Sequence, residues 1–404
     1  MKAKTLILLV IALAVLAGLA QWTRSKPGGR TAPATPQKLV TFDVNSADQL
    51  TIAAGAQTTV LARAGETWVV RSLWDYPADF TTLAEQVRRL AGLEGLPVRG
   101  GEQALADFGL APASSAASNA PASELITVSF QAAGRELGVV NLGNARTGRD
   151  DGSGMGGYPN GQYVRAATGP VLLAKEYLGS LPRKPQDWIS RNLVNVPRGE
   201  LEYLMVQATN GASYGLLADT AGVFRLSGLA AGQEMKAEAA ESMAGALQNL
   251  SAVNVLDPKA DPATTGLAHP ATFVAKLKNG LTYTVKVGGP AASDNGRAVQ
   301  LAVSYEKPEP PTPAITTNTA GVVTDTVKAF EQVAEAQAKQ AQTEHARLAP
   351  WTFVVADYVA ANFLRTREEL VQVVTSPPPA AVAAPAEQPT PAAGEVVPPA
   401  APQP

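Results

Sequence analysis

The chain contains no cysteine among its 404 residues. This absence excludes disulfide bonds, thiol nucleophiles and cysteine-ligated metal sites, so stability has to come from core packing. Histidine is almost as scarce, because only His269, in a turn, and His345, in a polar segment, are present. Neither has a carboxylate cluster at ligand spacing, so the sequence predicts no zinc site and no bound cofactor. The formal net charge is −2 without a basic stripe, which argues against nucleic acid as a partner.

Long hydrophobic runs are also missing, with one exception near the start. Residues 5–23 form an uncharged run that follows Lys2 and Lys4. A helix over this run is roughly 28 Å long, close to the hydrocarbon thickness of a bilayer. The sequence therefore predicts a single-pass transmembrane helix in contact with membrane lipid. We expect the inner (cytoplasmic) membrane, with the bulk of the chain periplasmic. A secretory signal cut after Ala20 is the alternative, because Gly18 and Ala20 are small.

Composition divides the rest of the chain. After the anchor or signal segment 1–23, residues 24–38 are a Pro/Gly/Thr linker. Residues 375–404 are rich in Pro and Ala and too poor in apolar side chains to form a core, which predicts a disordered tail. The stretch between them is long for one domain. It is interpreted as a first α+β repeat over 39–198 and a second over 199–374, the latter with a helical insertion at 307–348.

Internal similarity is the basis for two repeats. LAGLEGLPV aligns with LQNLSAVNV, and FGLAP aligns with TGLAH, both at a shift of 157 residues. VVNLGNA resembles VKVGGPA farther along the chain. The similar strings are 90–98 and 247–255, 108–112 and 265–269, 139–145 and 285–291, and 170–181 and 350–364. One duplicated unit with two differently placed insertions explains the changing shifts.

The periodicity of apolar residues predicts the same elements in each repeat. Alternating strands come first, and Asn210-Gly211 marks a hairpin in the second repeat. A helix capped by Asp79 is expected through Leu90 in the first repeat, and a helix over 235–250 in the second. Further strands follow, and a short helix near 171–180 or 353–365 is expected to close each repeat. The fold class predicted is α+β, with antiparallel sheet and helices on one face.

The insertion in the second repeat has its own character. Residues 324–349 are strongly helical by propensity. Val327, Phe330 and Val333 give this segment a short apolar edge. Two interpretations stay open, a helix that packs on the surface of the body and an arm that docks a partner.

Short motifs of known enzymes occur, but their context does not fit. The G-x-G-x-x-G string at 152–157 precedes a strand instead of a helix, and the G-x-S-x-G string at 211–215 lies in a hairpin. Ser304-Tyr305-Glu306-Lys307 is followed at once by proline instead of lying on a helix. The sequence therefore predicts no catalytic residues. Trp74 and Tyr76 precede the first helix, where two interpretations stay open: packing around the start of the helix, or an exposed surface for a sugar or a partner. Together with Phe330 they are our candidate partner surface, whereas Trp68 on an alternating strand is interpreted as core.

Several of these strings resemble a known family. The Trp68 strand, Tyr76-Pro77-Ala78-Asp79 before a helix, Phe108-Gly109-Leu110-Ala111-Pro112, Leu142-Gly143, and Asp187-Trp188 are similar to the bacterial domain-of-unknown-function family DUF4340. The match is better over 68–200 than in the second repeat. The resemblance implies a membrane-anchored extracytoplasmic protein, in some cases encoded beside ABC-type transport components linked to gliding. It assigns no catalytic residue.

These observations favour a non-enzymatic accessory protein that binds a protein partner in the envelope, such as an ABC-type complex. Two alternatives stay open. A secreted hydrolase of envelope polysaccharide would need paired carboxylates, for which Asp75, Asp79 and Asp187 are candidates. A purely structural spacer would be favoured by a long exposed inserted helix.

Overall fold

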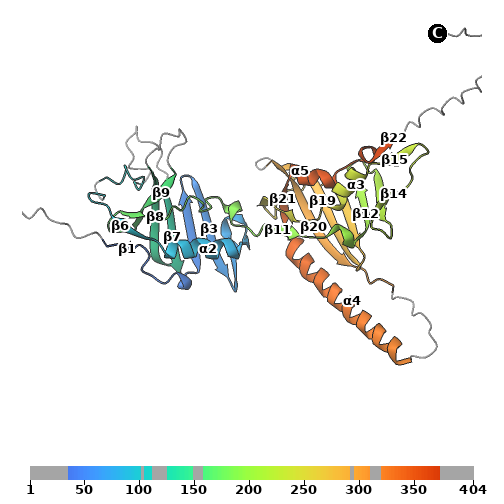
Figure 1. Cartoon of the computed structure of the whole chain (residues 1–404), viewed down its shortest axis with the longest axis horizontal. Helices are drawn as coiled ribbons and strands as arrows, with labels where there is room; N and C mark the ends of the chain where they lie inside the picture. The colour runs from blue at the N-terminus through green and yellow to red at the C-terminus, as the bar shows by residue number, and fades with distance from the viewer. Residues whose placement is uncertain are drawn as a thin grey trace, which may run out of the picture.

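The computed structural model describes residues 35–101, 104–111, 125–148, 158–291, 295–309 and 320–373. Most of the chain forms two antiparallel sheets with few helices, in agreement with the predicted α+β class (Figure 1). We call the larger sheet with its helix the first body and the smaller sheet with its helices the second body. Among the described helices, none is long and apolar enough to span a membrane. The predicted anchor at 5–23 and the predicted tail at 375–404 lie outside the described residues.

The first body is built on a ten-stranded sheet with the order β1-β6-β10-β9-β8-β7-β2-β3-β4-β5. Each pair of neighbours is antiparallel. The 3₁₀ turns of this body are η1 (Val44–Ser46), η2 (Arg71–Leu73) and η4 (Pro185–Asp187). The strands are β1 (Gln37–Lys38), β2 (Gln49–Ala54), β3 (Gln57–Ala64), β4 (Thr67–Val70), β5 (Tyr76–Pro77), β6 (Glu94–Pro97), β7 (Ile126–Ala132), β8 (Arg135–Thr147), β9 (Pro159–Ala166) and β10 (Leu172–Ala174).

The second body is built on an eight-stranded sheet with the order β14-β13-β12-β18-β19-β20-β21-β17. Two short ribbons, β11 with β16 and β15 with β22, flank it. Its strands are β11 (Asn192–Val194), β12 (Leu201–Gln207), β13 (Ser213–Ala218), β14 (Phe224–Leu226), β15 (Gln233–Met235), β16 (Leu250–Ser251), β17 (Asn254–Leu256), β18 (Ala271–Leu277), β19 (Leu281–Ala291), β20 (Gly296–Tyr305), β21 (Thr352–Ala356) and β22 (Val371–Val373). Its short helical turns are η5 (Arg198–Glu200), α5 (Asp357–Ala360), η6 (Ala361–Phe363) and η7 (Glu368–Leu370).

Alternating side chains explain why one face of each sheet is buried. In β2, Leu50 and Ile52 are buried and lie opposite Phe130 and Val128 of β7. A slip of one residue would move both to the other face, so this alternation sets the register. The predicted hairpin at Asn210-Gly211 is also confirmed, because it joins β12 to β13.

Helix α2 (Phe80–Ala91) packs on the buried face of the first sheet and confirms the predicted first helix. The Asp79 carboxylate caps it and accepts hydrogen bonds from the N–H groups of Thr81 and Thr82, at 3.0 and 3.4 Å. Leu83 and Leu90 are buried at helical spacing. The cap satisfies first-turn donors that have no partner within a helix.

Helix α3 (Ala237–Ala244) is much shorter than the helix predicted over 235–250. Met235 belongs to β15 and Leu250 to β16, where each pairs with another strand. Gly245 ends the helix, and Asn249 then adopts a left-handed backbone with φ of 53°. The apolar residues just outside α3, Met235 and Leu250, therefore belong to strands and do not extend the helix.

The two helix starts predict opposite effects of substitution. Lys236 occupies the N-cap of α3 with nearly the same backbone angles as Asp79 (φ −74° against −72°), but it makes no capping hydrogen bond. We expect Asp79→Ala to lower the free energy of unfolding by about 1 kcal/mol and Lys236→Asp to raise it by a similar amount. Urea unfolding followed by circular dichroism measures both, and a destabilised Lys236→Asp protein would contradict the assignment of this cap.

The prediction that a short helix closes each repeat is wrong in the first body and only partly correct in the second. Residues 172–174 form β10 between β6 and β9, with Leu172 and Ala174 buried. In the second body β21 covers 352–356, and only α5 and η6 follow as helical turns. Both segments pair with neighbouring strands, and this long-range pairing outweighs their local preference for helix.

Helix α4 (Ala320–Leu348) confirms the helix predicted in the insertion, and it is the long helix beside β20 in Figure 1. Ala334, Ala341 and Leu348 recur every seven residues and are buried, so a narrow stripe of the helix packs on the second body. His345 Nδ1 accepts a hydrogen bond of 3.3 Å from the Val303 N–H, beyond the point where β21 stops pairing with β20. The helix therefore covers part of a strand edge that would otherwise be open.

The two bodies meet at a small apolar junction. Tyr76 of β5 is 5 % exposed, and its ring packs edge-on against Trp351 at 5.0 Å between centroids and against Phe353 at 6.1 Å. Its hydroxyl donates to the Ser190 carbonyl at 3.0 Å. Arg347 of α4 donates to the carbonyl oxygens of Asn192 and Leu193. β11 lies within the predicted first repeat (39–198), yet it pairs with β16 of the second body.

Candidate binding groove

An open apolar groove of about 560 Å³ lies between α2 and the first sheet. Its walls come from three places: η1, the strands β2, β3, β4 and β7, and one side of α2. Trp68 and Phe130 contribute aromatic rings from the sheet, and Phe80 contributes one from the first turn of α2. Apolar clefts with a few polar groups at the edge are typical of binding sites.

The helix wall is a stripe of four positions. Phe80, Ala84, Val87 and Ala91 recur at intervals of four, three and four residues, so they share one side of α2. The eleven steps from Phe80 to Ala91 along the helix correspond to roughly 16 Å, which sets the length of this wall. Phe80 is 65 % exposed, and an exposed aromatic ring at the edge of an apolar cleft is a common anchor for ligands.

The opposite wall is formed by η1 and by strand β4. Asp43 caps η1 by accepting from the Asn45 N–H at 3.0 Å, which holds Val44 at the edge of the groove. Trp68, interpreted from sequence as core, packs against the core and also lines the groove. A flat indole ring that is only partly buried offers a large contact area with little loss of side-chain freedom.

Three charged side chains surround this apolar floor. Arg63 on β3, Glu66 in the turn before β4, and Arg88 on α2 all line the groove and are exposed. Arg63 donates from Nε to the Gly65 carbonyl at 3.1 Å. No ion pair joins any of the three to another residue in the described part of the chain. The edge of the groove therefore carries two guanidinium groups against one carboxylate.

The predicted partner surface of Trp74, Tyr76 and Phe330 is not one surface. Trp74 is 43 % exposed after η2, with a left-handed backbone at φ of 54°. Tyr76 is buried at the junction, so its place on an exposed surface is wrong. Phe330 lies on α4 of the second body, beneath Lys307, whose ammonium group is 5.5 Å from the ring centroid. The turn before α2 brings β5 against the second body, which local sequence cannot indicate.

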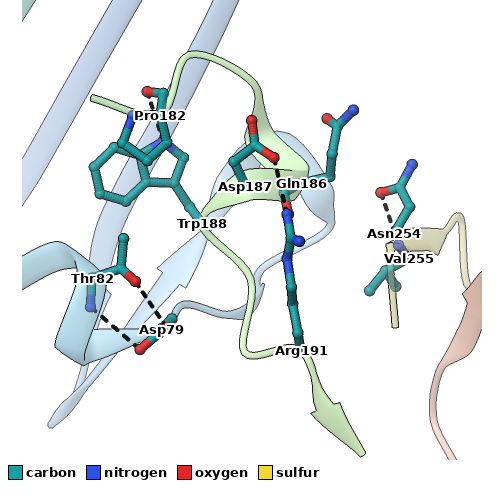
Figure 2. Close-up of polar contacts among 9 residues, drawn as sticks. All are labelled: Asp79, Thr82, Pro182, Gln186, Asp187, Trp188, Arg191, Asn254 and Val255. Carbon is teal, nitrogen blue, oxygen red and sulfur yellow. Dashed lines mark hydrogen bonds and ion pairs between the residues drawn. The ribbon is translucent and has the colours of Figure 1, made fainter. Parts of the chain in front are cut away.

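The candidate carboxylates of the hydrolase alternative each have a separate structural partner, and Figure 2 shows two of the three, Asp79 and Asp187. Asp79 accepts from the Thr82 hydroxyl at 2.9 Å in addition to capping α2. Asp187 pairs with Arg191 at 2.9 Å, and Asp75 pairs with Arg71 at 3.4 Å. In Figure 2 the carboxylates of Asp79 and Asp187 point toward different partners on opposite sides of Trp188. None of the three lines the groove.

The remaining motif residues also occupy structural positions where they are described. Ser213 begins β13 in a hairpin, as predicted, and Lys307 binds the Glu331 carboxylate at 2.6 Å. The glycine-rich string at 152–157 lies outside the described residues. Within the described ranges, no group of three His, Asp or Glu side chains is placed to hold a metal ion.

Sequence reasoning missed the groove itself. The one available signal was Phe80 followed by Ala84 and Val87, because this adds a second apolar stripe to a helix whose core positions are Leu83 and Leu90. The opposite wall comes from residues between positions 40 and 70 of the sequence, and only the fold brings them beside α2.

The fold thus defines an α+β protein with two antiparallel bodies and an open apolar groove on the first. The chain belongs to a family described only as a domain of unknown function (DUF4340), which matches residues 68–270, half of the chain. The match begins in β4 of the first body and ends just before β18 of the second. The sequence resemblance is therefore confirmed. No curated protein and no solved structure matches the chain.

Proposed function

We propose that this protein is a membrane-tethered, non-enzymatic binding protein of the bacterial envelope, made of two α+β repeats. The observation that carries the binding role is the open groove with the exposed ring of Phe80 and the half-buried ring of Trp68. The run at 5–23 would hold the body at the inner membrane, and the partner would be a protein, such as an ABC-type membrane complex.

Strand order supports the duplication. Read from β17, the second sheet has the order β17-β21-β20-β19-β18-β12-β13-β14, and the first has β6-β10-β9-β8-β7-β2-β3-β4. Each strand of one order has a counterpart at the same place in the other. Helix α2 precedes β6 in the chain, and α3 precedes β17, so the helices correspond too.

Individual hydrogen bonds repeat in the same places. The Asp79 N–H donates to the Trp188 carbonyl at 2.7 Å, and the Lys236 N–H donates to the Leu370 carbonyl at 2.8 Å. The first residue of each pair precedes a helix, and the second lies at the end of a short 3₁₀ turn, Trp188 directly after η4 and Leu370 as the last residue of η7. Such agreement in long-range contacts is unexpected for unrelated halves of a chain.

A glycine contact also recurs and refines the alignment. The Asn144 N–H donates to the Phe108 carbonyl, and the Gly289 N–H donates to the Thr265 carbonyl, both at 2.8 Å. Gly109 and Gly266 follow these carbonyls with positive φ, where a Cβ atom would collide with the facing strand. Asn144 therefore matches Gly289 at a shift of 145, one less than the alignment of VVNLGNA with VKVGGPA.

Within this scheme the groove distinguishes the first repeat from the second. Ala240 and Ala244 of α3 take the places of Leu83 and Val87, and both are buried. Arg198 of η5 reaches Glu241 of α3 at 3.5 Å across the corresponding gap. Small side chains let a helix lie close to a sheet, so the second repeat is packed where the first is open.

Co-purification of the tagged full-length protein from mild detergent extracts of membranes tests the proposed function. Ala84→Glu places a charge on the groove wall, whereas Thr81→Glu places the same charge on an exposed position of α2 that does not line the groove. We expect the retained partner to fall at least tenfold in yield with Ala84→Glu and to be unchanged with Thr81→Glu. Equal retention by both variants would exclude the groove as the binding site.

A further inference from the structure

We propose that the groove is occupied by the acidic, proline-rich C-terminal segment of this same chain, through residues 395–399 (EVVPP), when no partner is bound. This inference rests on the proposed function, because it takes the groove to be a binding site. It adds the occupant and a means of regulating access.

The lining of the groove fits a proline-rich peptide. Trp68 and Phe80 present aromatic rings on opposite walls, and Val44 and Val87 add smaller apolar contacts. Proline-rich segments dock in aromatic-lined grooves because their extended helix is already formed and loses little entropy on binding. Residues 395–399 offer two valines and two prolines within five positions. A wall of roughly 16 Å accommodates five residues at about 3.1 Å each.

Charge favours this segment over the proline-containing linker at residues 24–38. The groove edge carries Arg63 and Arg88 against Glu66 alone, with no ion pair to another described residue. Residues 374–404 contain two glutamates and no lysine or arginine, whereas residues 24–38 contain four basic residues and no acidic one. Glu395 immediately precedes the apolar residues of the docking stretch, so its carboxylate can reach a guanidinium group at the groove edge.

The number of residues between β22 and the docking stretch sets the reach of the segment. Glu395 follows Val373, the end of β22 on the second body, by 22 residues. Such a segment spans up to roughly 70 Å in a polyproline conformation. Figure 1 places β22 on the second body and α2 on the first, so the segment has to pass the junction.

Docking of the tail would make partner binding competitive. The apparent dissociation constant of the partner rises in inverse proportion to the fraction of molecules whose groove is free. A strong partner displaces the tail, and a weak apolar competitor does not.

Cysteine cross-linking in the full-length chain tests this inference, because the natural chain has no cysteine to interfere. The test protein carries Ala84→Cys in the groove and Ala393→Cys beside the docking stretch. The control carries Glu241→Cys, the matching exposed position of α3, with the same Ala393→Cys. Under mild oxidation at low protein concentration, we expect the intramolecular disulfide to form at least tenfold faster in the test protein. Adding Glu395→Gln or Arg88→Gln should slow it several-fold.

Two other outcomes of the cross-linking experiment would overturn the inference that the tail occupies the groove of its own chain. Equal rates in the test and control proteins mean that the tail does not favour the groove. A disulfide-linked dimer in the test protein means that the groove takes the tail of a second copy. Retention of partner by the Thr81→Glu but not the Ala84→Glu protein would still support the proposed binding function in either case, so the two failures are distinguishable.

Discussion

Trp188→Ala is expected to lower the free energy of unfolding by about 3–5 kcal/mol, the range found when large buried aromatic side chains are truncated. Trp188 is fully buried beneath α2 in the first body. Its indole N–H donates to the Pro182 carbonyl at 3.2 Å, so truncation also leaves this partly buried carbonyl without its donor. The cavity cannot refill easily, because the Asp79 N–H donates to the Trp188 carbonyl and the Ser190 N–H donates to the Pro77 carbonyl, which hold the backbone here in place.

Trp74 provides the matched control. It belongs to the same body, but its side chain is 43 % exposed, so Trp74→Ala is expected to change stability by less than about 0.5 kcal/mol. Urea unfolding followed by far-ultraviolet circular dichroism compares the two variants without relying on tryptophan fluorescence. A loss below about 1 kcal/mol for Trp188→Ala would show that this side chain is not central to the first core.

The second large effect is a loss of stability at alkaline pH that depends on Tyr76. Burial raises the pKa of the Tyr76 hydroxyl to about 12, from the ordinary 10.0. The folded protein therefore retains a proton between these values that the unfolded chain releases. The contribution of the protonated Tyr76 hydroxyl to the free energy of unfolding is therefore fully present below pH 10 and is lost as the pH rises through 12. Two pKa units correspond to about 2–3 kcal/mol.

The Tyr76→Phe protein isolates this contribution. It lacks the hydroxyl that donates to Ser190, so at neutral pH we expect it to be less stable by about 1 kcal/mol. Burial also raises the pKa values of Tyr214 and Tyr283, but those residues are present in both proteins. The difference between the two unfolding free energies should therefore shrink and then reverse between pH 10 and 12. Parallel curves would show that Tyr76 ionises freely, and Tyr358→Phe, at an 81 % exposed site, should give such parallel curves.

Local patterns predicted most of the elements. The cap at Asp79, the alternation in β2 and β7, and the turn at Asn210-Gly211 each depend on a few neighbouring residues, and each was predicted correctly. Errors arose where a distant strand decides the conformation. The segment at 171–180 has apolar residues at helical spacing, but pairing with β6 and β9 makes part of it a strand.

The site was less predictable than the fold. Tyr76 lies in a turn, where an aromatic side chain is expected to be exposed. Contact with Trp351 from the second body buries it, and local sequence does not reveal that contact. Trp68 and Phe80 were visible in the sequence, but their convergence requires η1 and β4 to lie beside α2. A groove made from separate segments leaves no continuous motif, which explains why the predicted partner surface was placed elsewhere.

Photo-cross-linking in intact cells tests the central claim most directly. A photoreactive amino acid is placed in the full-length protein at position 84 in the groove, or at position 241 on α3 of the second body. The account predicts one discrete adduct with an envelope protein from position 84, lost when Val87→Glu is added, and none from position 241. Equal adducts from both positions, or none from position 84, would contradict it.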